Sequence, residues 1–351
     1  MNKKLVVIAV VAALVPATAM AEVTVYGRIH ASFDSVSGIA AEKNGLSVNN
    51  NSSRFGVKGN QALDGSLTAL YQIEASVAAN GDNGSGTGTA ASAFNGIRDT
   101  YIGVTGGFGT FLTGRLPAAN QYVYDTNMFA DQLGDAGNFI GGSLAGVGRA
   151  NSALHYVSPG MGGVNVALTY LPAHSTISST TIPTGGNSYG IKANYADNGV
   201  TASLTTFNVN VGTGFNVKPL SISGGYDFGP GSLSAQYVSA TNEAGADTKR
   251  TIINVGAKFK VSDGDAVKAQ FTKAGNKTAA GATVADGATM LAVGYDHSLS
   301  KTTGVYVVYA KVSNNTAGTY SMNGWGHQNQ LAAVAVGDNP SGFAVGLTHN
   351  F

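Results

Sequence analysis

The chain has 351 residues, no cysteine and a formal net charge of +1. These values exclude disulfide scaffolds and thiolate metal centres, and the near-neutral charge argues against a nucleic acid as partner. Only 11% of the residues are charged, against roughly 25% in soluble domains, while 49 glycines, 15 tyrosines and 14 phenylalanines favour strands and turns over helices.

The first 21 residues have the organisation of a secretory signal peptide. A basic start with Lys3 and Lys4 precedes the apolar run LVVIAVVAALV, and Ala19 and Ala21 form a small-x-small cleavage site. The run is shorter than the ~18–20 residues of a transmembrane helix, and no later apolar stretch reaches that length. We expect residues 1–21 to be cleaved and residues 22–351 to form one exported domain that enters a membrane only through strands.

From residue 22 onward, polar and apolar side chains alternate in many segments. The mature start places Ile29 and Phe33 on one face of a strand and Arg28 and His30 on the other. The same alternation recurs in the segments 164–170, 233–237 and 267–272. Alternation alone also suits a soluble β-sandwich, so the fold class depends on the turns.

Short and long connections alternate along the chain. The seven short connections are 60–66, 106–109, 158–163, 196–199, 229–231, 262–264 and 298–301. Eight longer polar connections lie between them, which gives sixteen strands with both ends on the short-turn side. We predict an all-β fold, a sixteen-stranded antiparallel transmembrane β-barrel with short periplasmic turns and long extracellular loops.

A barrel of this width encloses an aqueous channel. We therefore expect the polar face of each strand to line the lumen and the apolar face to meet lipid. Aromatic residues near strand ends are expected at the two membrane interfaces: Tyr71, Tyr170, Tyr195, Tyr226, Phe259 and Tyr295.

The connection 117–149 is less polar than a solvated loop requires. Its apolar and aromatic residues include Tyr122, Tyr124, Met128, Phe129, Phe139 and Ile140. Its carboxylates are Asp125, Asp131 and Asp135. We expect this loop to fold into the barrel, which would bury the apolar residues against the wall and leave the acids facing the lumen. A contact within an oligomer is the alternative.

Five motifs, in this order, resemble the general bacterial outer-membrane porins of the beta-proteobacterial (neisserial and comamonad-like) branch. They are VTVYGRI (23–29), SRFGVKG (53–59), GFGTFLTGR (107–115), NSALHYVSP (151–159) and GLTHNF (346–351). The resemblance covers essentially the whole mature chain. It implies a homotrimer of sixteen-stranded barrels, in which the third extracellular loop folds inward and its acids face arginines on the wall.

The resemblance also implies site residues. Arg54, Arg115 and Arg149 match the wall arginines, and Arg28 and Arg98 are further candidates without so clear a motif. Lys58 shares a strand face with Arg54. The loop acids Asp125, Asp131 and Asp135 would face them, but the loop lacks the PEFG-like segment of enterobacterial relatives, so the acid that faces the pore is left open.

These features predict a general diffusion channel for ions and small hydrophilic solutes. A channel that prefers small organic anions or sugars is the alternative, with Tyr122, Tyr124 and Phe129 as an aromatic track, and an adhesin or structural barrel is a more distant one. No enzyme is expected, because the histidines are scattered along the chain. No cofactor or metal is expected, since the segment 80–86 lacks the spacing of a calcium loop.

The chain ends on an apolar, alternating segment, AVGLTHNF, which we expect to be the last strand and to pair with the first. In the outer-membrane barrels that it resembles, a terminal aromatic residue such as Phe351 is the signal read by the barrel-assembly machinery. The expected location is the cell outer membrane. The expected partners are two further copies of the chain, outer-membrane lipid and lipopolysaccharide, and the assembly machinery.

Overall fold

A computed structural model gives the fold of the chain. It describes residues 22–40, 45–81, 93–118, 126–143, 148–173, 176–177, 180–181, 186–212, 215–242, 248–279, 281–322, 327 and 334–351. Strands dominate these residues, and a short helix, α2 (Gly137–Ser143), lies in the connection 118–148. Among the described residues, no helix has the length and hydropathy needed to cross a membrane.

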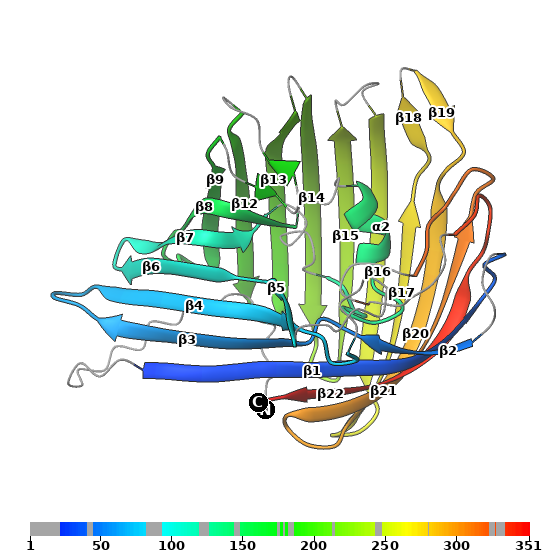
Figure 1. Ribbon diagram of the computed structural model, residues 1–351, viewed down its shortest axis with the longest axis horizontal. Coiled ribbons are helices and arrows are strands. Elements are labelled where there is room, and N and C mark those ends of the chain that lie inside the picture. Colours follow the sequence, from blue (N-terminus) through cyan, green and yellow to red (C-terminus); the bar gives the residue numbers. More distant parts are fainter. Residues whose placement is uncertain are drawn as a thin grey trace.

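Sixteen strands form one closed antiparallel sheet (Figure 1). They are β1 (Glu22–Ser37), β3 (Arg54–Ala62), β4 (Thr68–Val77), β6 (Thr100–Gly106), β7 (Gly109–Pro117), β8 (Arg149–Val157), β9 (Val164–Leu171), β12 (Ser188–Asp197), β13 (Val200–Gly212), β14 (Phe215–Asp227), β15 (Gly231–Asn242), β16 (Thr248–Lys260), β17 (Asp265–Ala274), β20 (Ala288–Ser298), β21 (Thr303–Asn314) and β22 (Ser341–Asn350). Each strand pairs with the next, and β22 pairs with β1 from Asn350 opposite Arg28 to Ser341 opposite Ser37. The predicted sixteen-stranded barrel is confirmed.

Six shorter strands extend the wall or form small hairpins in the connections. They are β2 (Gly45–Asn50), β5 (Phe94–Ile97), β10 (Thr176–Ile177), β11 (Thr180–Thr181), β18 (Lys277–Ala279) and β19 (Ala282–Val284). β2 lengthens the sheet beside the end of β1, and β5 does the same beside β4. β10 pairs with β11, and β18 pairs with β19.

The connections have their predicted lengths at one rim of the barrel, whereas two connections at the other rim are shorter than predicted. All seven predicted short connections join neighbouring wall strands. Two of the eight connections expected to be long are short as well, at 213–214 and 243–247, because the strands on both sides run on for 12 or 13 residues. Their Thr-, Val- and Asn-rich ends continue the period of two instead of forming loops.

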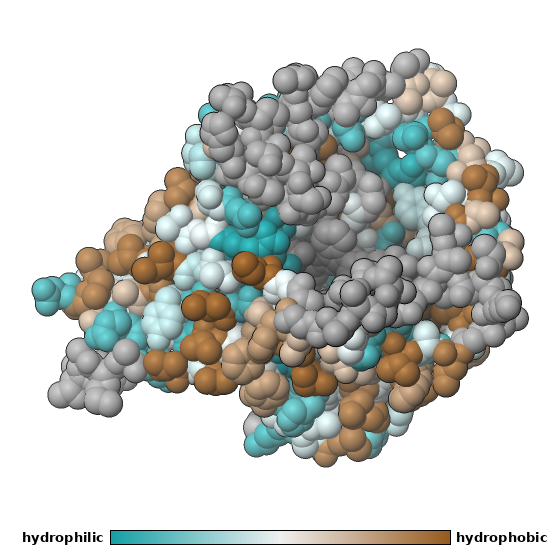
Figure 2. Space-filling model, in the orientation of Figure 1, coloured by the Kyte–Doolittle hydropathy of each residue, from teal (hydrophilic) through white to brown (hydrophobic). Residues whose placement is uncertain are grey.

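The outer face of the barrel is apolar. Side chains such as Phe33, Ile73, Leu233 and Val345 are 50% or more exposed. In Figure 2 hydrophobic residues gather along the left and lower margins of the molecule. Five of the six aromatic residues predicted at strand ends are exposed on this face, namely Tyr170, Tyr195, Tyr226, Phe259 and Tyr295. A continuous apolar surface of this extent indicates a face that contacts a membrane or another protein chain.

The inner face is divided into a polar part and an apolar part, which corrects the expectation of a polar lining throughout. On the inner face of β15 to β22, Val238, Ile252, Met290 and Val308 are at most 1% exposed. They belong to one buried cluster with Phe129 and other residues of the connection 118–148. This part of the wall is apolar because the connection covers it and keeps water away.

The end of the chain is fixed to the first strand. The N–H of Gly27 donates to the Phe351 carbonyl oxygen at 3.0 Å, and the N–H of Phe351 donates to the Gly27 carbonyl oxygen at 3.1 Å. The Phe351 ring lies where a β-carbon on residue 27 would be, so only glycine allows this close approach. β22 is therefore paired up to its last residue, and the terminus closes the barrel.

Candidate functional site

The connection between β7 and β8, residues 118–148, is the third long connection and is called loop 3 below. Its described part lies inside the barrel, and Figure 1 shows α2 in front of β15 and β16. The Met128 N–H donates to Gln270 Oε1 at 2.8 Å, and Gln270 Nε2 donates to the Gly134 carbonyl at 3.1 Å. Lys268 Nζ donates to Gln132 Oε1 at 2.9 Å. Loop 3 is thus hydrogen-bonded to the inner face of β17.

Apolar contacts support the same docking. The Phe129 ring is fully buried against the wall, and Lys268 Nζ lies 4.6 Å from its centroid in a cation–π contact. Gly134 packs so closely on Ala292 that a β-carbon at position 134 would overlap the Ala292 methyl group. Loop 3 therefore packs directly on β15 to β21. The wall from β1 to β6 is called the opposite wall below, and it carries the charged groups that face the loop.

Asp135 holds the turn of loop 3 together. Its side chain is 2% exposed and accepts hydrogen bonds from Asn127 Nδ2 at 2.5 Å, the Asp131 N–H at 2.7 Å and the Gly137 N–H at 2.7 Å. Burial, with a smaller contribution from the charge of Asp131, raises the pKa of Asp135 to about 7 although three donors favour the ionised form. Asp135 is an internal residue of the loop and does not face the opposite wall.

Asp131 does face that wall. Its carboxylate oxygen lies 3.0 Å from Arg28 Nη1 on β1. Its φ of 59° is in the left-handed region, which non-glycine residues adopt only when surrounding contacts enforce it. The bond from its N–H to Asp135 supplies such a contact. Asp125 and the aromatic residues Tyr122 and Tyr124 lie outside the described residues.

Three arginines converge on the wall opposite loop 3. Arg28 and Arg54 are direct partners in the β1–β3 pairing, and Arg98 follows β5. Arg98 Nε lies 2.5 Å from Glu74 Oε1, and Arg54 Nε lies 4.0 Å from Glu74 Oε2. Tyr26 Oη also donates to Glu74 at 2.9 Å. This arginine cluster (Arg28, Arg54 and Arg98) has two carboxylate partners, Asp131 and Glu74, and so carries a net positive charge.

Lys58 adds a cation on the same face. It lies on β3 four residues after Arg54, on the same face of the strand, and its Nζ is 5.1 Å from the centroid of the Tyr26 ring. The alternation in SRFGVKG placed both residues on the polar face, and the structure has both on the inner face. Phe55 and its neighbour Val57 take the other register, where Phe55 contacts Phe94 at a centroid distance of 5.9 Å.

The other two arginines of the motifs are not part of this cluster. Arg115 donates from Nε to the Ile97 carbonyl at 2.9 Å and from Nη1 to Asn151 Oδ1 at 2.7 Å. Arg149 is paired with Asp99, with 2.5 Å between Nε and Oδ1. Sequence reasoning grouped Arg115 and Arg149 with Arg54, whereas the structure places them in a second cluster beside Asp99.

Strand register explains this difference. Leu112 and Leu116 are buried on the inner face of β7, while Phe111 is 41% exposed on the outer face. Arg115 lies on the outer register with Phe111, and the β7–β8 pairing is irregular between Gly114 and Leu116. A motif match identifies the residue type, but the strand register decides which face the residue takes, and simple alternation from Phe111 already places Arg115 on the outer face.

Several functional groups of the inner wall belong to no sequence motif. Glu74, His30 and Tyr306 are at most 7% exposed on the inner face; Glu74 and His30 fall on polar registers of their strands, whereas Tyr306 lies on an apolar one. Alternation alone would place Glu74 and His30 on the lumen side. Their partners come from strands distant in sequence, which alternation does not reveal.

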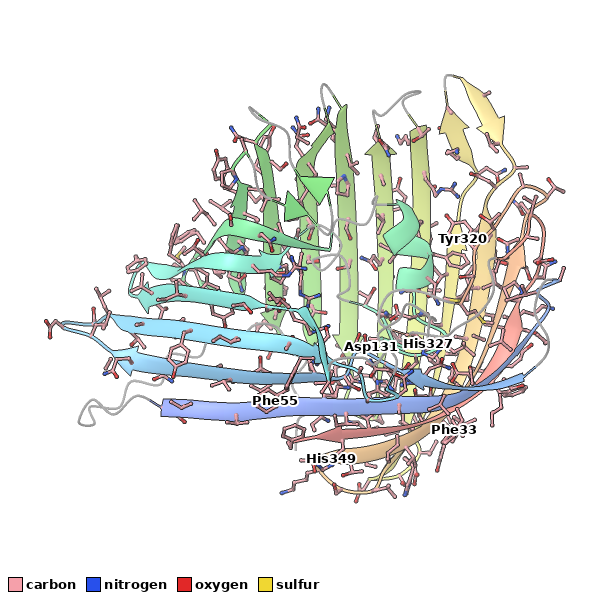
Figure 3. All side chains as sticks on the ribbon, viewed as in Figure 1. Phe33, Phe55, Asp131, Tyr320, His327 and His349 are labelled. Carbon is pink, nitrogen blue, oxygen red and sulfur yellow. The ribbon has the colours of Figure 1, made fainter. Side chains whose placement is uncertain are left out.

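The last long connection, residues 315–340, also reaches the inner wall. His327 Nε2 lies 2.6 Å from Asp34 Oδ2 on β1, and both side chains are fully buried. Figure 3 shows Asp131 and His327 within the barrel, while Phe33 and His349 project from its outer side. The segment 80–86 lies mostly outside the described residues, and among the described residues no group of three or more His, Asp or Glu could hold a metal ion.

A closed barrel with an apolar outer face, an inward loop and a charged inner wall defines an outer-membrane channel protein. Residues 8–317 match the family model of the Gram-negative porins, and the chain belongs to this family. The protein is therefore located in the cell outer membrane and forms a channel there.

Individual relatives agree with this assignment. The chain is 28% identical to outer membrane porin protein 32 of Delftia acidovorans over the full length of both chains. It is 28% identical to the major outer membrane protein P.IB of Neisseria gonorrhoeae over 59% of this chain and 58% of the relative. The anion-selective porin from Comamonas acidovorans has the same fold, with a TM-score of 0.79, 24% identity and coverage of 95% of this chain and 100% of that one.

Proposed function

We propose that the protein is a general diffusion channel for ions and small hydrophilic solutes, narrowed by loop 3 opposite the arginine cluster. The contact of Asp131 with Arg28 carries this proposal, because it joins the inward loop to the opposite wall. Opposed cationic and anionic side chains create a transverse field in the remaining opening. Such a field orients water and polar solutes and hinders apolar ones.

The charges around this constriction favour anions. Arg28, Arg54 and Arg98 exceed the carboxylates Asp131 and Glu74 by one charge, and Lys58 adds a second on the same wall. One unit charge at 4 Å is worth about 1 kcal/mol even in water, which changes an ion ratio about fivefold. A solved relative carries the description of an anion-selective porin, in line with this preference.

A substrate-preferring channel for small organic anions is the second candidate. The same arginine cluster favours it, because guanidinium groups bind carboxylates through paired N–H donors. Phe129 does not support an aromatic track, since its ring is fully buried against the wall. The two candidates therefore differ in whether anions of equal size pass at different rates.

Three further features belong to the proposal. Residues 1–21 act as a cleaved signal peptide, and residues 22–351 form a single domain without enzymatic activity. The functional unit is a homotrimer; a trimer form is described for the structurally similar OmpT of Vibrio cholerae, which has a TM-score of 0.69 and 16% identity. The outer face contacts outer-membrane lipid and lipopolysaccharide, and the assembly machinery reads Phe351.

Planar-bilayer recording of the refolded protein tests the proposal. We expect stepwise conductance increases in groups of three and a reversal potential in a KCl gradient that favours chloride. Absence of channel activity, or a preference for potassium, would contradict it. Liposome swelling with neutral sugars and organic anions of graded size then separates the two candidates, because a general channel ranks solutes by size, whereas a substrate-preferring channel passes one anion class faster than neutral solutes of equal size.

A further inference from the structure

His30 is a buried histidine next to the arginine cluster. It lies on the inner face of β1, two residues after Arg28, and its side chain has no exposed surface. The backbone N–H of His30 donates to Ser53 Oγ at 2.9 Å, and Ser53 Oγ donates to the backbone carbonyl oxygen of His30 at 3.1 Å. These two hydrogen bonds fix the backbone of His30 at the point where the pairing partner of β1 changes from β3 to β2.

Both ring nitrogens of His30 have a partner. Nδ1 lies 2.9 Å from Arg28 Nη2, and Nε2 lies 2.8 Å from Tyr306 Oη. A guanidinium group has only donors, so Nδ1 must accept and carries no proton. The neutral imidazole then has its proton on Nε2, which donates to Tyr306. The contacts allow one tautomer and leave no place for a second proton.

Tyr306 fixes the far side of the ring. It lies on β21, is 4% exposed, and meets the His30 ring edge to face at a centroid distance of 5.4 Å and an angle of 80°. Its oxygen also receives a hydrogen bond from Asn51 Nδ2 at 3.3 Å, and Asn51 Nδ2 donates to Ser32 Oγ at 2.9 Å. Strands β1 and β21 and the residues before β3 thus hold the imidazole in one orientation.

The charged groups around His30 come from several elements. Arg28 and Asp34 lie on β1, and His327 comes from the last connection and pairs with Asp34. Lys268 on β17 lies 6.0 Å from the Tyr306 ring centroid, and Asp131 of loop 3 lies on the far side of Arg28. A second proton on His30 would add a cation directly against the Arg28 guanidinium, where the only atom it could bond is already a donor.

We propose that His30 is a positioning residue of the constriction: as the neutral Nε2–H tautomer it accepts one N–H of Arg28, and so directs the guanidinium at Asp131. Loop 3 is thereby joined to the wall by three successive contacts, from Tyr306 to His30, from His30 to Arg28 and from Arg28 to Asp131. This inference rests on the proposed function, since it names the residue that orients one of the constriction arginines. His30 itself contacts no permeating solute.

The tautomer is directly observable. Long-range 1H–15N correlation spectra of refolded protein labelled with 15N-histidine report which imidazole nitrogen carries the proton, and loss of a signal in H30N assigns His30. We expect the neutral Nε2–H pattern at neutral pH and still at about pH 6, below the ordinary histidine value of about 6.5. An Nδ1–H pattern, or a doubly protonated ring at neutral pH, would overturn the proposal.

Bilayer recordings test the effect on the channel. R28Q removes the charge opposite Asp131 and is expected to shift the reversal potential towards potassium. H30Q removes the acceptor at Nδ1 and should shift it in the same direction by a smaller amount, because Arg28 is no longer held on Asp131. H30N keeps an acceptor near the position of Nδ1 and should restore most of the wild-type selectivity. The double variant R28Q/H30Q should match R28Q alone.

A second buried histidine provides the matched control. His155 on β8 is 5% exposed, and its Nδ1 lies 3.0 Å from Thr169 Oγ1. H155Q should leave the reversal potential unchanged, which separates the proposed role from the general cost of altering a buried ring. Heat-dependent mobility in gels reports whether each variant forms a folded barrel.

The outcomes separate the two levels of the account. If R28Q shifts the reversal potential and H30Q does not, the role of His30 is refuted while the proposed constriction stands. The same holds if H30Q shifts it further in the R28Q background. If R28Q itself has no effect, the constriction as described is wrong and the role of His30 falls with it.

Discussion

At the scale of single residues, the carboxylates of loop 3 show that neighbours decide what one side-chain type does. Asp131 and Asp135 are four residues apart in the same turn. Asp131 is 20% exposed at its side chain and bonds a wall arginine, whereas Asp135 is buried and accepts three hydrogen bonds within the loop. The sequence alone treated them as equivalent, because both are acids in a loop expected to fold inward.

The raised pKa of Asp135 predicts a pH-dependent stability. Its pKa in the folded protein, about 7, lies above the ordinary 3.8, so the folded state binds more protons than the unfolded state between these values. The free energy of unfolding should therefore fall as the pH rises from about 4 to about 7, and this contribution should level off above that. Thermal unfolding of wild type and D135N between these values of pH measures the effect.

In this comparison D135N should lose part of the pH dependence of the wild type. The matched control is D263N, which alters an exposed aspartate in the turn between β16 and β17. It should keep the wild-type dependence. Equal pH dependence in wild type and D135N would show that Asp135 does not take up a proton in this range.

The wall arginines show what alternation can predict. Alternation placed Arg54 and Lys58 on one face of β3, and both lie on the inner face, since no bulge interrupts the strand between them. Arg115 follows the same kind of motif but lies on the outer register beside an irregular pairing. The alternation in FLTGR places Arg115 on the face of Phe111, so the register separates Arg115 from Arg54 although the motif match groups them.

At the scale of elements, the inward loop and the apolar inner wall form one unit. The inner faces of β15 to β21 and the loop residues Phe129, Leu133 and Ile140 share a buried cluster. The apolar content of loop 3 correctly predicted an inward fold. The apolar inner wall was not predicted, because strands such as β20 and β21 are apolar on both faces and alternation gives no signal there.

Phe129 should therefore control how firmly loop 3 is docked. Truncation of a fully buried phenylalanine costs about 3–5 kcal/mol, so F129A should weaken the docking and raise the single-channel conductance and its fluctuations. F111A is the matched control, because Phe111 is 41% exposed on the outer face and is not a member of the buried cluster that holds loop 3. A wild-type conductance for F129A would show that other contacts hold the loop.

At the scale of the whole molecule, the number of short and long connections predicted the number of strands in the barrel. Seven short connections that alternate with eight longer ones predict sixteen strands, and the barrel wall has sixteen. The prediction succeeded because each short turn forces an antiparallel neighbour. The lengths of two outer connections were wrong, since β13 to β16 extend beyond the turns that their composition suggested.

The closure of the barrel depends on its last residue. Deletion of Phe351 removes two backbone hydrogen bonds to Gly27 and the ring that covers it. We expect the deletion to lower the yield of folded barrel in the outer membrane strongly, while barrels that do form keep the wild-type conductance. F343A, which alters an exposed aromatic residue within β22, should reduce the yield less. An unchanged yield for the deletion would refute this role.

The central claim is that the arginine cluster facing Asp131, and not every arginine of the motifs, sets the selectivity of the channel. The most direct measurement is the reversal potential in a KCl gradient for R54Q and R115Q, which remove the same charge from the inner and the outer register. We predict that R54Q shifts the reversal potential towards potassium while R115Q leaves it at the wild-type value. Equal shifts for the two variants, or a shift for R115Q alone, would contradict the account.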